Sequence, residues 1–234
     1  MRAQGDSNYL TTAGAFHLEL GYLGDLLNSS STFWRETLSK NRRALASIAN
    51  HNSDGLYMQS VDADEGTWNS QTASVQECVA PYYASLLHAY LRSNRTDEEA
   101  LQLYREAMEA AEQASLITTA TKDGHIYTRD LNTAESYSRQ KDRFDSFMHY
   151  EGCGLAGVLA LGADALEDQL PSSPVARRRE MFEIYAAWRQ ADGLAETCHS
   201  AALQTLIGLP PERIYFENGR LAKTNPQHSA AHLT

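Results

Sequence analysis

The sequence predicts an all-α protein of about seven helices, because apolar residues recur at helical spacing along most of the chain. The alternation of polar and apolar residues that is typical of strands is scarce. Polar connectors with turn-forming residues, such as Asn52–Gly55 and Pro171–Pro174, separate the apolar segments. These three observations favour a fold built from helices and short connections.

The first three helices are predicted from residues that share one helical face. In residues 16–27 the apolar positions step by four, three and four: Phe16, Leu20, Leu23 and Leu27. In residues 34–48 the same kind of spacing holds for Trp34, Leu38, Leu45 and Ile48. A third helix is predicted around Tyr83, Leu87 and Tyr90.

The fourth helix is predicted to begin at a capping box, Thr96-Asp97-Glu98-Glu99. Its apolar face then contains Leu101, Tyr104, Met108 and Ala111. Three further helices are expected over residues 155–166, 181–188 and 194–206. Between the fourth and fifth helices, Gly124–Thr128 fits a short hairpin arm.

Composition limits the class of protein. The 234 residues, 42% hydrophobic and 21% charged, are enough for one domain with a sizeable core. The sequence contains no run of 18 apolar residues, so it predicts no membrane span. The net charge of -10 disfavours nucleic acid as a partner, because phosphate recognition needs clustered Lys and Arg.

Cysteines and sequons bear on the compartment. The three cysteines show no C-x-x-C spacing, so no zinc site is expected. Asn28 and Asn94 begin N-x-S/T sequons in hydrophilic connectors and are candidate glycosylation sites. These sequons favour the secretory pathway, although residues 1–6 lack the apolar region of a signal peptide, so no targeting signal is recognised.

Two segments resemble a known family. Gly193–Phe216 is similar to L-x-E-T-C-Y-x-M-Y-x-x-x-x-T-G-L-S-P-E-x-x-x-F, and Met148–Ala163 to M-E-H-L-A-C-F-A-G-G-M-L-A-L-G-A. Both motifs belong to the class I α-1,2-mannosidases, glycoside hydrolase family 47. Leu10–Leu20 and Val79–His88 resemble two upstream motifs of the same family. Because the segments follow one another in the family's order, the resemblance covers most of residues 8–217.

The resemblance implies a fold and a chemistry. The family forms an (αα)7 barrel of paired helices, of which about seven helices would be a middle section. We therefore expect a partial barrel domain over residues 1–217 and a polar, disordered tail over residues 218–234. The family's two motif cysteines form a disulfide, which here would join Cys153 to Cys198. Its members work in the endoplasmic reticulum, in the Golgi or as secreted proteins.

The family's reaction is calcium-dependent removal of mannose from N-glycans with inversion, which needs two carboxyl groups about 6.5 to 9.5 Å apart. In the resembled motif A-D-S-Y-Y-E-Y the two acids fall on Ala80 and Ala84, and neither alanine can carry a proton. Further motif residues fall on Thr12 and Tyr150. The family's catalytic-glutamate helix and calcium-binding threonine have no counterpart, so we expect no calcium site in this chain.

Other acids are candidates for the vacated roles. Glu77 and Glu151 lie near the vacated positions in the sequence, but acids at helix ends more often solvate or cap the helix. Glu212 matches a family glutamate that faces the glycan, which makes it a candidate substrate-binding residue. It is equally well interpreted as a helix-terminal acid after Pro210-Pro211.

These observations predict an α-1,2-mannosidase-like protein that is catalytically inactive. One alternative is a binding module for high-mannose glycans or misfolded glycoproteins, and another is a piece with no stable fold. A partial barrel should leave an apolar face uncovered, for example on the helix of Tyr83, Leu87 and Tyr90. The expected partners are therefore a high-mannose N-glycan or glycoprotein and either the missing barrel half or a second copy.

Overall fold

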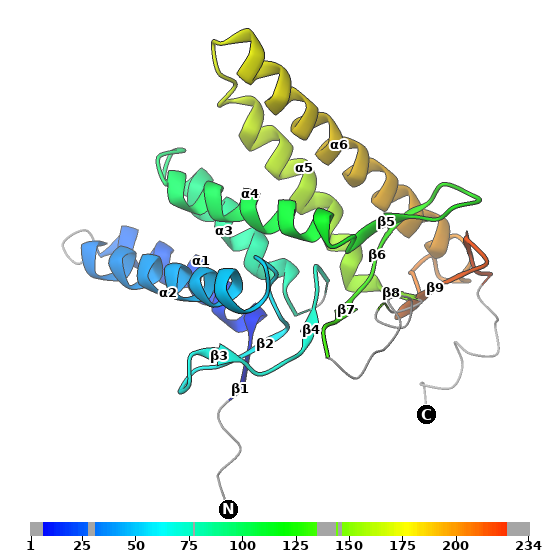
Figure 1. Ribbon diagram of the computed structural model, residues 1–234, viewed down its shortest axis with the longest axis horizontal. Helices are drawn as coiled ribbons and strands as arrows, with labels where there is room; N and C mark the ends of the chain where they lie inside the picture. The colour runs from blue at the N-terminus through cyan, green and yellow to red at the C-terminus, as the bar shows by residue number, and fades with distance from the viewer. Residues whose placement is uncertain (1–6, 28–30, 77, 135–143, 145–146, 224–234) are drawn as a thin grey trace, which may run out of the picture.

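The fold is dominated by helices (Figure 1). The computed structural model describes residues 7–27, 31–76, 78–134, 144 and 147–223. Within them the helices are α1 (Leu10–Leu26), α2 (Ser31–Asn52), α3 (Ala80–Arg92), α4 (Glu98–Gln113), α5 (Gly154–Glu167) and α6 (Pro174–Ala202), with a 3-10 turn η2 (Tyr150–Cys153) before α5. None of these described helices has the length and hydropathy needed to cross a bilayer.

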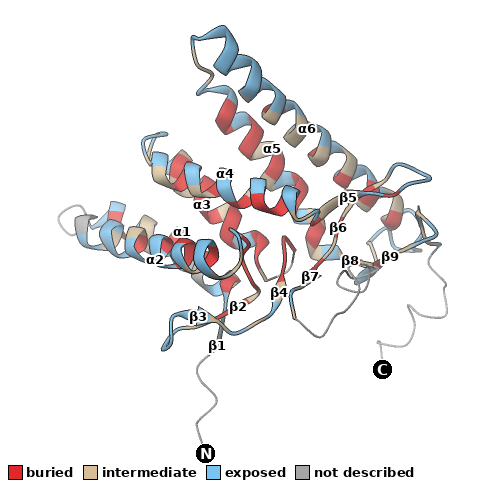
Figure 2. Cartoon of the chain, in the orientation of Figure 1, coloured by how far each residue is buried: buried red, intermediate tan, exposed pale blue. Residues whose placement is uncertain are grey.

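Helices adjacent in the sequence pack together as hairpins: α1 with α2, α3 with α4, and α5 with α6. The first members of the hairpins also contact one another in order, because α3 packs against both α1 and α5. Buried residues gather where the helices face each other (Figure 2). The largest fully buried side chains include Tyr82, Tyr83 and Tyr90 of α3, so this helix is the centre of the core.

The structure has six α-helices in its described residues, where the sequence analysis predicts seven. The predicted helices 181–188 and 194–206 are parts of the single helix α6, which continues through Gly193 and ends at Ala202. A Cβ atom at Gly193 would lie 2.6 Å from the Cδ1 atom of Ile126. Glycine therefore lets the hairpin containing Ile126 approach α6 closely, and it does not interrupt the helix.

Short strands connect the helices. They are β1 (Ser7–Tyr9), β2 (Ser60–Asp62), β3 (Thr67–Trp68), β4 (Thr72–Ala73), β5 (Ile117–Thr119), β6 (Ile126–Thr128), β7 (Leu131–Asn132), β8 (Phe147–His149), β9 (Arg213–Glu217) and β10 (Arg220–Leu221). The predicted hairpin arm is confirmed, because β6 pairs antiparallel with β5. Strand β9 lies between β8 and β10, which joins distant parts of the chain. Arg220 and Leu221 form strand β10, although they belong to the segment 218–234 that is predicted to be a disordered tail, and residues 224–234 of that segment lie outside the described residues.

The apolar face expected to lack a cover is in fact buried. Tyr83, Leu87 and Tyr90 are each at most 1% exposed, because α1, α4 and α5 surround α3. The exposed large apolar side chains of the helices lie instead mainly on α1 and α6, at the two ends of the row of hairpins. They include Phe16, Tyr22 and Leu26 on α1 and Met181, Phe182, Tyr185 and Trp188 on α6.

The start of α4 differs from the predicted capping box by one residue. Asp97, and not Thr96, is the N-cap, and its Oδ1 atom accepts a hydrogen bond of 3.2 Å from the backbone N–H of Ala100. The other oxygen of Asp97 accepts a 2.8 Å hydrogen bond from Arg42 of α2. This carboxylate therefore caps α4 and also ties it to the first hairpin.

Candidate functional site

The N-terminal ends of α1, α3 and α5 lie at the same end of the fold. The backbone N–H of Thr11, in the first turn of α1, donates a 2.9 Å hydrogen bond to the carbonyl of Cys78, which precedes α3. The N–H of His149, which precedes η2 and α5, donates a 2.8 Å hydrogen bond to Oε1 of Gln76. These contacts bring together three segments that resemble motifs of one family, which makes this end of the fold the candidate sugar site.

A buried polar network holds the loop before α3. Asp130 is 4% exposed, and its two oxygens accept hydrogen bonds from Gln76 at 2.7 Å and from Gln59 at 3.1 Å. The backbone carbonyl of Gln76 accepts the N–H of Ala80 at 2.8 Å. Because its polar atoms are paired in this way, the network fixes the start of α3. The sequence analysis did not find it, since no motif or spacing connects these residues.

The two positions that the resemblance assigns to the family's acids are both on α3. Ala80 is the first residue of the helix and is 7% exposed, and Ala84, one turn later, is partly buried. Thr12 is exposed in the first turn of α1. None of these three side chains carries the carboxyl group that glycoside hydrolysis uses as acid or base.

The remaining acids are placed differently from one another. Glu151 lies in η2, and its Oε2 atom is shielded from solvent without a hydrogen-bond partner among the described residues. Glu212 has an exposed side chain, and its backbone carbonyl accepts the N–H of Tyr150 at 3.0 Å. Glu77 lies outside the described residues. The interpretation of Glu212 as a helix-terminal acid is wrong, because strand β9 and not a helix begins at Arg213.

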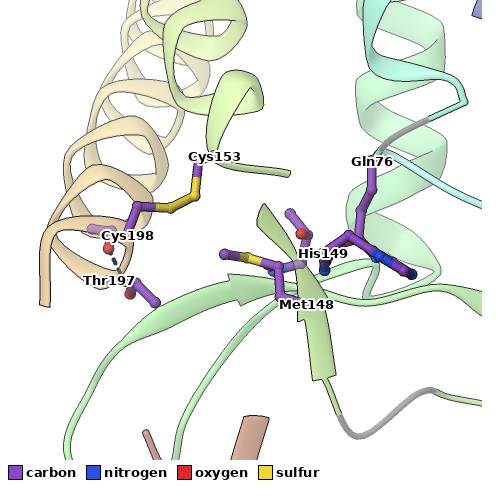
Figure 3. The surroundings of a disulfide bond; sticks show 8 residues. Gln76, Met148, His149, Cys153, Thr197 and Cys198 are labelled. Atoms are coloured by element: carbon purple, nitrogen blue, oxygen red, sulfur yellow. Dashed lines mark hydrogen bonds between the residues drawn. A yellow bond between two sulfur atoms is a disulfide. The ribbon is translucent and has the colours of Figure 1, made fainter. Parts of the chain in front are cut away.

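The expected disulfide is present (Figure 3). Cys153 at the end of η2 is bonded to Cys198 of α6, with a Cα–Cα distance of 6.0 Å that lies in the usual range. Beside it, the buried hydroxyl of Thr197 donates a 2.9 Å hydrogen bond to the carbonyl of Gly193 within α6. Cys78 takes no part in a disulfide. The bond therefore joins the start of α5 to the C-terminal part of α6.

The structure describes the asparagine of only one of the two sequons. Asn94 is exposed in the turn between α3 and α4, where it adopts a positive φ of 56°. Asn28 lies outside the described residues. Glycosylation of either residue stays a prediction.

The described residues contain no cluster of side chains that is typical of a calcium site. Calcium takes 6 to 8 oxygen ligands, usually with several carboxylates among them. No three His, Cys, Asp or Glu side chains gather as a metal site in the part of the chain that the structure describes.

Comparison with known proteins gives relatives of one kind. The chain is 29% identical over 214 residues to mannosyl-oligosaccharide alpha-1,2-mannosidase IA of Drosophila melanogaster, covering 92% of this chain and 28% of that protein. It is 28% identical over 218 residues to mannosyl-oligosaccharide 1,2-alpha-mannosidase IA of Sus scrofa, covering 93% and 29%. The chain thus spans less than one third of the length of these relatives.

A solved structure shows the same fold. The α-1,2-mannosidase from Trichoderma reesei matches with a TM-score of 0.70 and 15% identity, over 98% of this chain and 43% of that one. The family model described as glycosyl hydrolase family 47 matches residues 1–233. Since that match extends over nearly the whole sequence, the chain belongs to glycosyl hydrolase family 47.

Proposed function

We propose that this chain is an α-1,2-mannosidase-like protein, related to the glycosidases that trim mannose from N-glycans, and that it does not itself hydrolyse mannose. The proposal rests on the start of α3, where the resemblance assigns the positions of the family's two acids to Ala80 and Ala84. Ala80 is nearly buried and is held by the Gln76 carbonyl, so no water-activating carboxylate stands there.

The buried acids nearby do not replace the missing ones. Both oxygens of Asp130 accept hydrogen bonds from glutamine amides, so this carboxylate holds connectors in place. Glu151 lies on η2, before α5, and not on α3. Acid-base groups contribute about 10² to 10⁴ in rate each. Loss of the family's acids is therefore enough to remove measurable turnover.

We expect no mannose release when the purified chain is incubated with a high-mannose oligosaccharide, with or without calcium. Ala80→Asp should not restore release, since the inverting step needs a second carboxyl group to act as acid while the first acts as base. Released mannose is measured by anion-exchange chromatography, with an active family enzyme as the positive control. Release above a protein-free blank would contradict the proposal, and its loss in Glu151→Gln would identify the replacement acid.

A second candidate function is glycan binding without turnover. Tyr150 and Tyr215 are each 45% exposed near Glu212, and aromatic rings with a polar tip are common at binding surfaces. Calorimetry with the same oligosaccharide separates the two functions. Binding that Tyr150→Ala weakens favours the module, whereas heat changes no larger than those of dilution exclude it.

We propose the secretory pathway as the compartment. Disulfides such as Cys153–Cys198 persist in oxidising compartments and are rare in the cytosol. The exposed turn at Asn94 is accessible to a glycan there. One related protein, from Saccharomyces cerevisiae, is named an endoplasmic reticulum mannosidase.

We also propose that the exposed apolar faces of α1 and α6 are covered by further barrel helices or by a second copy of the chain. On α6, Met181, Tyr185 and Trp188 are spaced as one helical stripe, and each is at least 42% exposed. We expect the chain on its own to elute above monomer size, and Met181→Glu with Tyr185→Glu to reduce that size. Val175→Glu, on the same helix but off the stripe, is the control. A monomeric wild-type chain would exclude self-association.

A further inference from the structure

A cavity of about 210 Å³ lies between α1, α2 and the turn from α3 to α4, away from the sugar-site end. Arg92 in its wall is the last residue of α3, whereas Ala80 is the first, so about 18 Å of helix separates them. The cavity could hold about seven water molecules at roughly 30 Å³ each. It is therefore a separate site of small-molecule size.

Three guanidinium groups line this cavity, from Arg35 and Arg42 of α2 and Arg92 of α3. Only 6% of the Arg42 side chain is exposed, and its Nε atom has no hydrogen-bond partner among the described residues. The protein has a net charge of -10, so three arginines around one cavity depart from its general charge. A buried guanidinium acts on its surroundings with little screening by water.

The two carboxylates of the cavity, Asp25 and Asp97, already have partners. Asp25 accepts hydrogen bonds from Arg35 at 3.0 Å and from Arg92 at 2.7 Å. The hydrogen bond from Arg35, together with the charge of Arg92, holds the pKa of Asp25 below its usual value despite partial burial. Asp97 is held by Arg42 and by the first turn of α4.

The lining therefore has more donors than acceptors. Each guanidinium carries five N–H donors. Arg35 uses one of them, on Asp25, and Arg92 uses two, on Asp25 and on the carbonyl of Leu18. The lining itself contains three guanidinium groups and two engaged carboxylates, and a third carboxylate, Glu99, lies 3.8 Å from Arg42 outside the lining. Such a lining selects a ligand that is rich in acceptors and negatively charged.

We propose that this cavity binds a small oxyanion, namely a phosphate group. The group belongs either to inorganic phosphate or to a small phosphate monoester, and the cavity volume leaves room for a compact substituent. The site uses the chain's own side chains and is independent of mannose hydrolysis. Arg35 is the residue through which it is tested, because its side chain is 69% exposed and its replacement leaves the core intact.

Thermal unfolding and calorimetry test the site with sodium phosphate, glycerol 3-phosphate and sodium chloride at equal ionic strength and pH. We expect phosphate to raise Tm above its value in chloride, since a ligand of the folded state stabilises it. Arg35→Gln should weaken phosphate binding about tenfold or more, because a hydrogen bond to a charged group is lost.

Arg43→Gln is the matched control. Arg43 lies on the same helix, its side chain is also 69% exposed, and it pairs with Glu99 outside the cavity lining. This variant should keep wild-type phosphate affinity. The proposal would be overturned if the wild type had equal Tm values in phosphate, glycerol 3-phosphate and chloride. It would also be overturned if Arg35→Gln and Arg43→Gln lost phosphate affinity equally. Stabilisation by glycerol 3-phosphate alone would assign the site to a monoester, and stabilisation by both ligands to the phosphate group itself.

Discussion

Removal of the Cys153–Cys198 disulfide is expected to lower the free energy of unfolding by about 4 kcal/mol. The bond closes a loop with a sequence separation of 45 residues, and the chain-entropy model gives this value for a loop of that length. The bond stabilises the fold by restricting the unfolded chain, because the cross-linked residues cannot move apart when α5 and α6 separate. Urea unfolding with and without dithiothreitol measures the difference.

Two variants separate the disulfide from other effects of the reductant. The double variant Cys153→Ser with Cys198→Ser should have the urea midpoint of the reduced wild type. Dithiothreitol should not lower the midpoint of this variant further. Cys78→Ser should respond to reduction like the wild type, because Cys78 lies outside the bond. A wild-type midpoint unchanged by complete reduction would contradict the assigned contribution.

Gly14→Ala is expected to destabilise the chain by about 2 kcal/mol. A Cβ atom at this position in α1 would lie 2.8 Å from the Cα atom of Tyr82 and 2.9 Å from its backbone nitrogen. Backbone atoms cannot rotate away as a side chain can, so α1 and α3 must separate. Overpacking costs about 1 to 3 kcal/mol, which exceeds the gain of up to about 1 kcal/mol in helix propensity.

Gly157→Ala in α5 is the matched control, because no atom beyond the neighbouring backbone of its own helix lies within 4 Å of its Cβ position. Here only helix propensity changes, so the variant should be more stable than the wild type by up to about 1 kcal/mol. Urea midpoints of both variants give the comparison. Shifts of the two urea midpoints in the same direction would contradict overpacking at Gly14.

The helices could be predicted where an amphipathic face continued without interruption. Helix α4 is such a case, since its acidic start and its apolar stripe agree with each other. Helix α6 is one helix where two are predicted, and the close packing of Ile126 on Gly193 that accounts for the glycine is not visible in the sequence. The strands, of two to five residues, are too short for an alternating pattern to emerge.

The candidate site was predictable only where a motif resembled the family. That resemblance predicted the disulfide between Cys153 and Cys198, which the structure contains. The assignment of a vacated acid position to Ala80 stays a prediction. The contacts of Asp130 with Gln59 and Gln76 were not predictable, because the three residues come from separate connectors and meet only in the folded chain. Buried polar pairs of this kind depend on tertiary geometry and leave no periodic signal.

The length of α6 gives the protein an uneven resistance to local opening. Its 29 residues extend over about 43 Å, and the α5–α6 hairpin projects away from the other helices (Figure 1). The buried residues of α6 begin only at Ile184, and the disulfide at Cys198 holds the opposite end. Amide hydrogens in the first turns after Pro174 therefore exchange with solvent through fraying, whereas those near Cys198 exchange only when the whole domain opens.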